Sequence, residues 1–187
     1  LPRALALSLP AGAEAARGFE VRDMAYLDRH SSPTLSPDGR VLVFAKRVVD
    51  KATHKSSTSL WTRNLLTRDM RPPSRLTPEG WNVNSPSFSA DGKTVYFMSG
   101  KSGSMQLYSL PIAGGEPTRL TDYALDVDAY KFSPDGTHVA LAFAVFPDCK
   151  ADLTCTKKKL DDVDALKTTG KVFDRMFIRH WDTWNDG

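Results

Sequence analysis

The segment of this chain richest in chemically active groups is Arg179–Trp184, which reads Arg-His-Trp-Asp-Thr-Trp. It combines a guanidinium, a carboxylate and an imidazole that titrates near neutral pH with two indole rings. In an extended strand, alternate side chains point to opposite faces. One face would then carry Arg179, Trp181 and Thr183, and the other His180, Asp182 and Trp184. In a purely structural role, the tryptophans would fill packing gaps and the arginine would pair with the aspartate.

The two cysteines, Cys149 and Cys155, are the next candidates for chemistry. Residues 1–18 are rich in alanine and leucine, and we expect a signal-peptide remnant or a disordered tail there. An exported protein meets an oxidising compartment, so the pair favours a local disulfide. A metal site would need further ligands close in sequence, and none are present. Two free buried thiols remain the alternative.

Motifs for catalysis or cofactor binding are missing from the sequence. Gly100–Ser104 lacks the final glycine of a nucleophile elbow. The four histidines show no zinc-type spacing, and there is no phosphate loop. The acidic pairs Asp126/Asp128 and Asp161/Asp162 offer too few oxygens for calcium and suit solvated surface. The sequence therefore predicts no catalytic residue, no metal and no cofactor.

These residues belong to a chain built from a repeat. Residues 32–44, 85–98 and 129–141 share the pattern Leu/Phe-Ser-Pro/Ala-Asp-Gly followed by an apolar run. The first two copies also begin with Ser-Pro. The aspartates of successive copies are 53 and then 44 residues apart. A period in the forties, built from short β-type runs, is typical of four-stranded propeller blades. The sequence therefore predicts an all-β fold, a β-propeller with about three to four blades present.

Each copy contains the residues of a tight turn. In the first, Pro37 fixes φ at the second turn position, Asp38 suits the third and Gly39 can adopt positive φ. This predicts a hairpin with a glycine bulge. The apolar runs after the turns do not alternate with polar residues, which predicts strands covered on both faces. They span residues 41–45, 95–98 and 139–146.

The remaining strands repeat as well. Arg-Leu-Thr occurs at 75–77 and again at 119–121, which predicts equivalent fourth strands. We expect third strands at 60–65 and 106–110, a long polar loop at 50–59, and Trp81 and Tyr123 between blades. A short helix or an extended lead-in is expected at 19–29. The blades are expected near residues 30–78, 80–122 and 123–187. The last would be interrupted by an insertion at 147–170, with a helix over 156–169 that stops at Gly170.

Composition narrows the function classes. The chain has 187 residues, 41% of them hydrophobic and 25% charged, as in ordinary globular proteins. The net charge of +3 is scattered, which gives a nucleic-acid partner little support. No apolar run approaches the roughly 18 residues of a membrane span. Propellers close at about four to eight blades, so we expect a fragment whose uncovered blade face promotes association.

The repeats resemble the propellers of TolB-type proteins and of the prolyl oligopeptidase family of serine peptidases. Three further segments narrow the resemblance: Phe19–Met24, Phe146–Thr156 with its two cysteines, and Arg179–Trp184. Together they resemble secreted bacterial dipeptidyl-peptidase V and acylaminoacyl-peptidase-like enzymes, over about Phe19–Gly187. In that family the propeller precedes an α/β-hydrolase domain with a Ser-Asp-His triad. None of the triad positions exists here, so the resemblance gives this stretch no catalytic residue.

This resemblance implies the propeller of a periplasmic or secreted serine exopeptidase, which gates the access of peptides to the hydrolase domain. The implied partners are peptide substrates and that downstream domain, and a homodimer stays open. A dipeptidyl-peptidase needs an acidic group for the substrate's ammonium and aromatic walls around its first side chains. Asp182 could supply the charge and Trp184 the wall, with His180 tuning the site and Arg179 beside them. The alternative is a non-enzymatic, TolB-like periplasmic propeller that binds protein partners.

Overall fold

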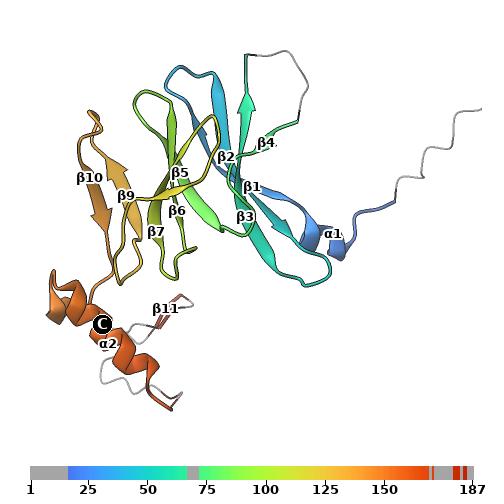
Figure 1. Ribbon diagram of the computed structural model, residues 1–187. Helices are drawn as coiled ribbons and strands as arrows, with labels where there is room; N and C mark the ends of the chain where they lie inside the picture. Colours follow the sequence, from blue (N-terminus) through green and yellow to red (C-terminus); the bar gives the residue numbers. More distant parts are fainter. Residues whose placement is uncertain (1–16, 67–71, 169, 171–178, 182, 185–187) are drawn as a thin grey trace, which may run out of the picture.

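The computed structural model describes residues 17–66, 72–168, 170, 179–181 and 183–184. Its strands form two four-stranded antiparallel sheets, followed by two two-stranded sheets (Figure 1). We call the first sheet blade 1; it holds β1 (Arg29–Leu35), β2 (Val41–Val49), β3 (Ser56–Asn64) and β4 (Ser74–Arg75) in that order. Blade 2 repeats the order with β5 (Val83–Phe88), β6 (Thr94–Ser99), β7 (Gln106–Pro111) and β8 (Thr118–Arg119). This confirms the predicted propeller-type blades.

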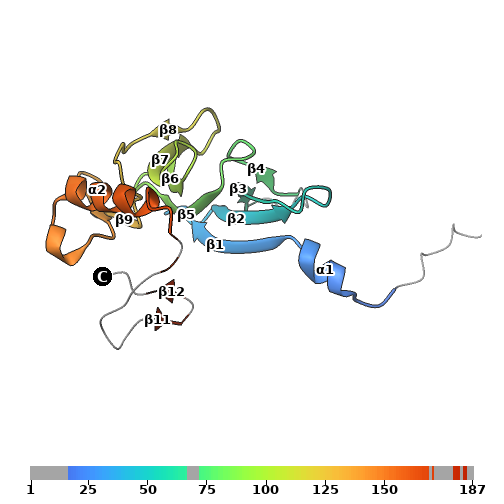
Figure 2. The ribbon, with the colours of Figure 1, turned by 90° about the horizontal axis from the view of Figure 1, so that it is seen from below.

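The third sheet pairs β9 (Ala129–Phe132) with β10 (Val139–Ala142), and we call it sheet 3. The three sheets stand one after another in chain order (Figure 1). The β1–β2, β5–β6 and β9–β10 turns lie at one end of this array. Helix α1 (Val21–Tyr26) precedes β1 at the opposite end. Helix α2 (Leu153–Asp164) follows β10 and crosses the end of sheet 3, as the view from below shows (Figure 2).

The turns at the first end have the predicted geometry in all three sheets. Gly39, Gly92 and Gly136 have φ angles of 70°, 70° and 71°, which few residues other than glycine adopt without strain. In each turn the glycine N–H donates to the carbonyl of the serine three residues earlier. The Ser-Pro/Ala-Asp-Gly signature thus specifies one local structure three times.

The Ser-Pro pairs have a separate role, at the unpaired edges of blades 1 and 2. Ser32 and Ser85 adopt φ of 50° and 49°, and the strand register shifts at both places. Such bulges turn an edge strand away from regular pairing, and the prolines that follow offer no N–H there. Sheet 3 lacks the Ser-Pro pair, and β9 pairs with β10 without a shift.

The repeated Arg-Leu-Thr motif ends each four-stranded blade. Its Thr77 hydroxyl accepts a hydrogen bond from Leu60 N at 2.9 Å, and Thr121 accepts one from Leu107 N at the same distance. Each hydroxyl therefore satisfies an N–H of the third strand where the two-residue fourth strand stops. The predicted fourth strands are present but shorter than the motif.

Blade 2 is the centre of the core because both of its faces are covered. Val95 and Phe97 on one face pack with residues of blade 1, among them Leu60. Met98 and Leu107 on the other face pack toward sheet 3. Alternate residues of one strand thus enter two different hydrophobic clusters. The unbroken apolar run of β6 predicted a strand covered on both faces, and the two clusters confirm this prediction.

Three predictions about element boundaries are wrong. The polar stretch 50–59 is not one long loop, because β3 starts at Ser56 and Asp50 closes a tight turn by accepting hydrogen bonds from Ala52 N and Thr53 N. The insertion helix begins at Leu153, because Asp152 caps it, and ends at Asp164, well before Gly170. Starting earlier also places the three lysines inside the helix.

The third wrong prediction concerns the apolar run 139–146. Strand β10 ends at Ala142, and the chain then leaves the sheet toward the insertion. Val139 is 38% exposed, and Leu141 is only half-buried. The run is apolar enough for a strand covered on both faces, but the described residues place a blade against only one of them.

Candidate functional site

The three turns each carry an aspartate whose carboxylate is hydrogen-bonded within the turn. In each, a serine hydroxyl donates to the aspartate: Ser36 to Asp38 at 2.6 Å, and Ser133 to Asp135 at 2.5 Å. A backbone N–H two residues after each aspartate adds a second bond. These bonds lower the pKa of Asp38, and they lower that of Asp135 to about 2. These hydrogen bonds of the two carboxylates stay within their own turns, so we assign both carboxylates a role in the scaffold.

A cavity of about 450 Å³ lies between β5 and β9, the first strands of blade 2 and sheet 3. Its wall from blade 2 includes Pro86 and Phe88, and its wall from sheet 3 includes Phe132 and Pro134. Phe132 stacks on Tyr96 with ring centroids 4.1 Å apart, which fixes the floor. Four aromatic rings and two prolines share the lining with four serines, so the cavity suits an apolar side chain or a short peptide segment.

Tyr130 closes one side of this cavity and joins the two sheets. Its hydroxyl lies 2.6 Å from Ser85 O, 3.0 Å from Tyr96 O and 2.8 Å from Ser87 Oγ. Burial raises the pKa of Tyr130 to about 12, so the hydroxyl keeps its proton at neutral pH. It can donate to a carbonyl of the β5 bulge but cannot serve as a base. The chemistry of this group is binding and positioning.

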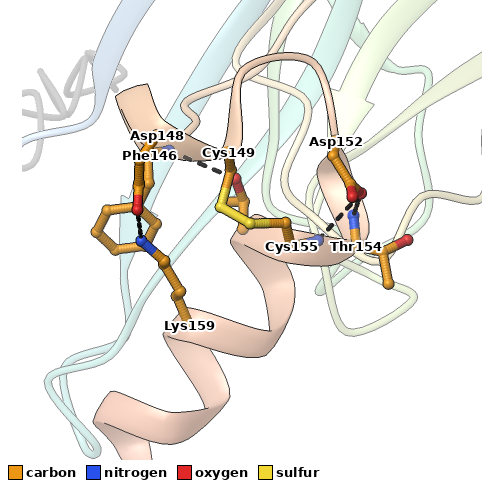
Figure 3. The surroundings of a disulfide bond; sticks show 8 residues. Phe146, Asp148, Cys149, Asp152, Thr154, Cys155 and Lys159 are labelled. Atoms are coloured by element: carbon orange, nitrogen blue, oxygen red, sulfur yellow. Dashed lines mark hydrogen bonds and ion pairs between the residues drawn. A yellow bond between two sulfur atoms is a disulfide. The ribbon is translucent and has the colours of Figure 1, made fainter.

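The disulfide region is compact (Figure 3). Cys149, in the short 3-10 helix η1 (Pro147–Cys149), is bonded to Cys155 in the first turn of α2. Asp152 caps α2 by accepting from Thr154 N at 2.9 Å and Cys155 N at 3.1 Å. The metal-ligand and free-thiol alternatives for these cysteines do not apply to this structure.

A second set of contacts holds the same region together. Lys159 forms an ion pair with Asp148, which lowers the pKa of that carboxyl. The Lys159 ammonium also lies 5.3 Å from the ring centroid of Phe146. Thr156, 2% exposed, accepts a hydrogen bond from Phe146 N. We call the segment from Phe146 to Lys159 the insertion stem.

The segment expected to bind substrate is described only in part. Strand β11 (Arg179–His180) pairs antiparallel with β12 (Thr183–Trp184), with Arg179 opposite Trp184 and His180 opposite Thr183. Trp181, at φ 55°, begins the reversal between them. The single extended strand with alternating faces is therefore wrong, because the backbone turns back within the segment. Asp182 lies outside the described residues, so its predicted role stays a prediction.

The described residues contain no group of three or more histidine, cysteine, aspartate or glutamate side chains arranged to hold a metal ion. None of the described helices is long and apolar enough to cross a membrane.

Tyr130, whose hydroxyl joins blade 2 to sheet 3, was not among the residues predicted from the sequence to have a role in a site. Tyr130 occupies the position of Pro33 and Pro86 in the other two copies. This replacement was the available signal, since a tyrosine in place of a proline can reach a neighbouring strand with its hydroxyl. The residues of the insertion stem other than the cysteines were missed because their contacts join two short helices.

Comparison with known proteins shows which proteins this chain is similar to. Residues 62–146, from β3 of blade 1 to the start of the insertion stem, match the family described as the dipeptidyl peptidase IV N-terminal region. A dipeptidyl-peptidase 5 from Porphyromonas gingivalis is 32% identical over 158 residues, 84% of this chain and 22% of that protein. The Tol-Pal system protein TolB of Francisella tularensis is 42% identical, but over 62 residues, 33% of this chain and 14% of TolB.

Among solved structures, the acylaminoacyl peptidase of Pyrococcus horikoshii has a similar fold. The TM-score is 0.53 at 12% identity, over 70% of this chain and 21% of that one. The chain thus spans about a fifth of the length of these peptidases. Residues 62–146 thus match the dipeptidyl peptidase IV N-terminal region, and most of the chain is similar to one part of a dipeptidyl-peptidase 5.

Proposed function

We propose that this chain is the propeller portion of a serine exopeptidase of the dipeptidyl- or acylaminoacyl-peptidase type. In this proposal an α/β-hydrolase domain follows in the same polypeptide and carries the catalytic triad. The propeller covers that domain, excludes folded proteins by size and admits peptides. The blades near 30–78, 80–122 and 123–187 are part of the proposal, as is the leader at 1–18.

The similarity to a dipeptidyl-peptidase 5 over 84% of the chain carries this proposal. The similarity extends well beyond one blade. A shared blade repeat alone would match many propellers, as the 62-residue match to TolB illustrates. The cavity between β5 and β9 agrees with a role in handling peptides, because its prolines and rings suit apolar side chains.

The proposed compartment is the periplasm or the exterior of the cell. Disulfides persist in oxidising compartments and are rare in the cytosol. The Cys149–Cys155 bond supports this placement. If the protein were purified from a reducing cytosol with both thiols alkylated, the placement would be wrong.

Within this function, we assign the substrate's free ammonium to Asp182, and its first side chains to Trp184, with His180 and Arg179 adjacent. An ion pair shielded from water stabilises a charged substrate group, and blocking the amine removes it. In the full-length protein, Asp182→Asn should therefore raise KM for free-amine dipeptide substrates far more than for N-acylated ones. An equal loss for both substrates would make the segment scaffold only.

The decisive experiment on the function uses the full-length protein and peptides with free N-termini. Release of dipeptides, together with labelling of a downstream serine by a phosphonate, is the expected result. Residues 1–187 alone should not be labelled, because a triad needs nucleophile, base and orienting acid on one scaffold. A full-length protein with no hydrolase domain would refute the proposal.

The alternative is a propeller without enzymatic activity that binds protein partners. The 42% identity to TolB over 62 residues is the observation that favours it. The same full-length sequence separates the two functions, because a non-enzymatic propeller would close its ring without a hydrolase domain.

A further inference from the structure

Helix α2 has an apolar stripe that the described residues cover at one end and not at the other. Positions 153, 156, 160 and 163 are three or four residues apart and lie on one side of a helix. Leu153 is half-buried and Thr156 is 2% exposed. Further along the same stripe, Leu160 is 42% exposed and Val163 51%. The stripe runs past the surface that buries its first half.

The insertion stem holds this helix firmly although the helix buries little of itself. The disulfide, the Asp152 cap and the Lys159–Asp148 ion pair all act on its first two turns. A helix of 12 residues is marginal in water without packing. The stem therefore fixes the direction in which the exposed end of the stripe is presented.

The position of α2 indicates at which end of the array a domain that contacts its exposed stripe would lie. Further blades of a propeller continue the array side by side with sheet 3. Helix α2 instead crosses the end of sheet 3, beyond the strands (Figures 1 and 2). Helix α1 lies at this same end, and Val21 and Met24 on it are 82% and 60% exposed. A domain that covers these exposed residues would therefore contact the end of the array at which α1 and α2 lie.

We propose that the exposed stripe of α2 docks onto the α/β-hydrolase domain of the same polypeptide, with Leu160 and Val163 in the contact. This inference rests on the proposed function. The matched part of dipeptidyl-peptidase 5 is only 22% of that protein, so most of such a chain lies outside the described array. An apolar stripe rimmed by charged residues suits a contact between domains of one chain.

The test places the photo-cross-linking residue p-benzoylphenylalanine at position 163 of the full-length protein. The matched control carries it at position 158, on the opposite side of the same helix. Irradiation should join position 163 to a peptide of the hydrolase domain, and the link should be lost at position 158. Links from position 163 to propeller residues or to a second copy, or no link at all, would each overturn the proposal.

A second measurement uses charges instead of a probe. Leu160→Asp with Val163→Asp should lower the Tm of the full-length protein and speed proteolysis between its two domains. Lys158→Asp, which adds the same residue on the opposite side, should leave both unchanged. Equal behaviour of the two variants would contradict the docking. A full-length protein lacking the hydrolase domain is recognised from its sequence alone, so that failure of the function is distinct from a failure of the docking.

Discussion

The two contacts of blade 2, with blade 1 and with sheet 3, are built differently. The contact with blade 1 is an apolar cluster of eight buried residues, among them Val43, Leu60 and Phe97. The contact with sheet 3 has three fully buried members, Met98, Leu107 and Val127, and half-buried side chains, most of them aromatic, pack against these three.

Hydrogen bonds compensate for the thinner packing of the second contact. The Tyr130 hydroxyl reaches two backbone carbonyls of blade 2. Between blades 1 and 2, Thr58 N donates to Asn82 Oδ1 at 3.1 Å, at an exposed position. The turns differ too. A Cβ at Gly92 would lie 3.2 Å from Pro37 of blade 1, whereas a Cβ at Gly136 would meet nothing within 4 Å. Where two complete sheets face each other, buried apolar area dominates the contact; where one sheet is short, a part-buried tyrosine hydroxyl adds hydrogen bonds to a smaller apolar cluster.

Removing a ring from the first contact should have the largest effect. Phe97 is fully buried between Trp81 and Tyr108, so Phe97→Ala leaves a cavity and should lower the free energy of unfolding by about 3–5 kcal/mol. Phe132→Ala, in the half-buried second contact, should cost clearly less. Denaturant unfolding of both full-length variants measures the two losses in the free energy of unfolding. Equal losses would show that the two contacts of blade 2 do not differ in this way.

Breaking the disulfide should have an intermediate effect. The bond joins residues six positions apart, so the loop-closure argument gives about 2 kcal/mol. Cys149→Ser with Cys155→Ser should speed hydrogen exchange in α2 and leave blade 2 protected. Mass spectrometry of the non-reduced protein should show two hydrogens fewer than the sequence requires. If blade 2 exchanged faster as well, the insertion would be part of the core.

The polar contact of sheet 3 is tested by Tyr130→Phe. The change leaves the carbonyls of Ser85 and Tyr96 without this donor, and should cost about 1–2 kcal/mol. Tyr96→Phe is the control, because its ring stacking on Phe132 is retained. We expect thermal unfolding of the full-length protein to show a loss for the first variant only. A neutral Tyr130→Phe would mean that packing alone holds sheet 3.

The smallest effect concerns the pH dependence of the turns. The pKa of Asp135 is about 2 in the folded protein, below the ordinary aspartate value of 3.8. A lowered pKa stabilises the fold at pH values above the ordinary one, and this contribution is lost as the pH falls from about 4 to about 2. Asp135→Asn should flatten the acid limb of the stability–pH curve relative to that of the unchanged protein. Identical curves would show that the turn needs no charge.

The local structure of this protein could be predicted because local residues cause it. Pro37, Asp38 and Gly39 determine their turn through φ preferences and a side-chain bond that reaches no further than neighbouring residues. The pairing of Cys149 with Cys155 could also be expected, since no other cysteines exist in the sequence. The repeat of these local units gave the blade period and hence the fold class.

Contacts between sheets were decided only by the tertiary structure. The role of Tyr130 depends on the carbonyl of Ser85, which lies in a bulge 45 residues earlier, and on that of Tyr96. The exposure of Val139 depends on what lies beside β10, which hydrophobicity does not reveal. The same holds for Arg179–Trp184: alternation assumed one strand, whereas the backbone reverses at Trp181. The interactions that form a turn involve only a few consecutive residues, so they can be predicted from the sequence. The burial of a side chain depends on residues that are distant in sequence, and only the tertiary structure shows which of these lie beside it.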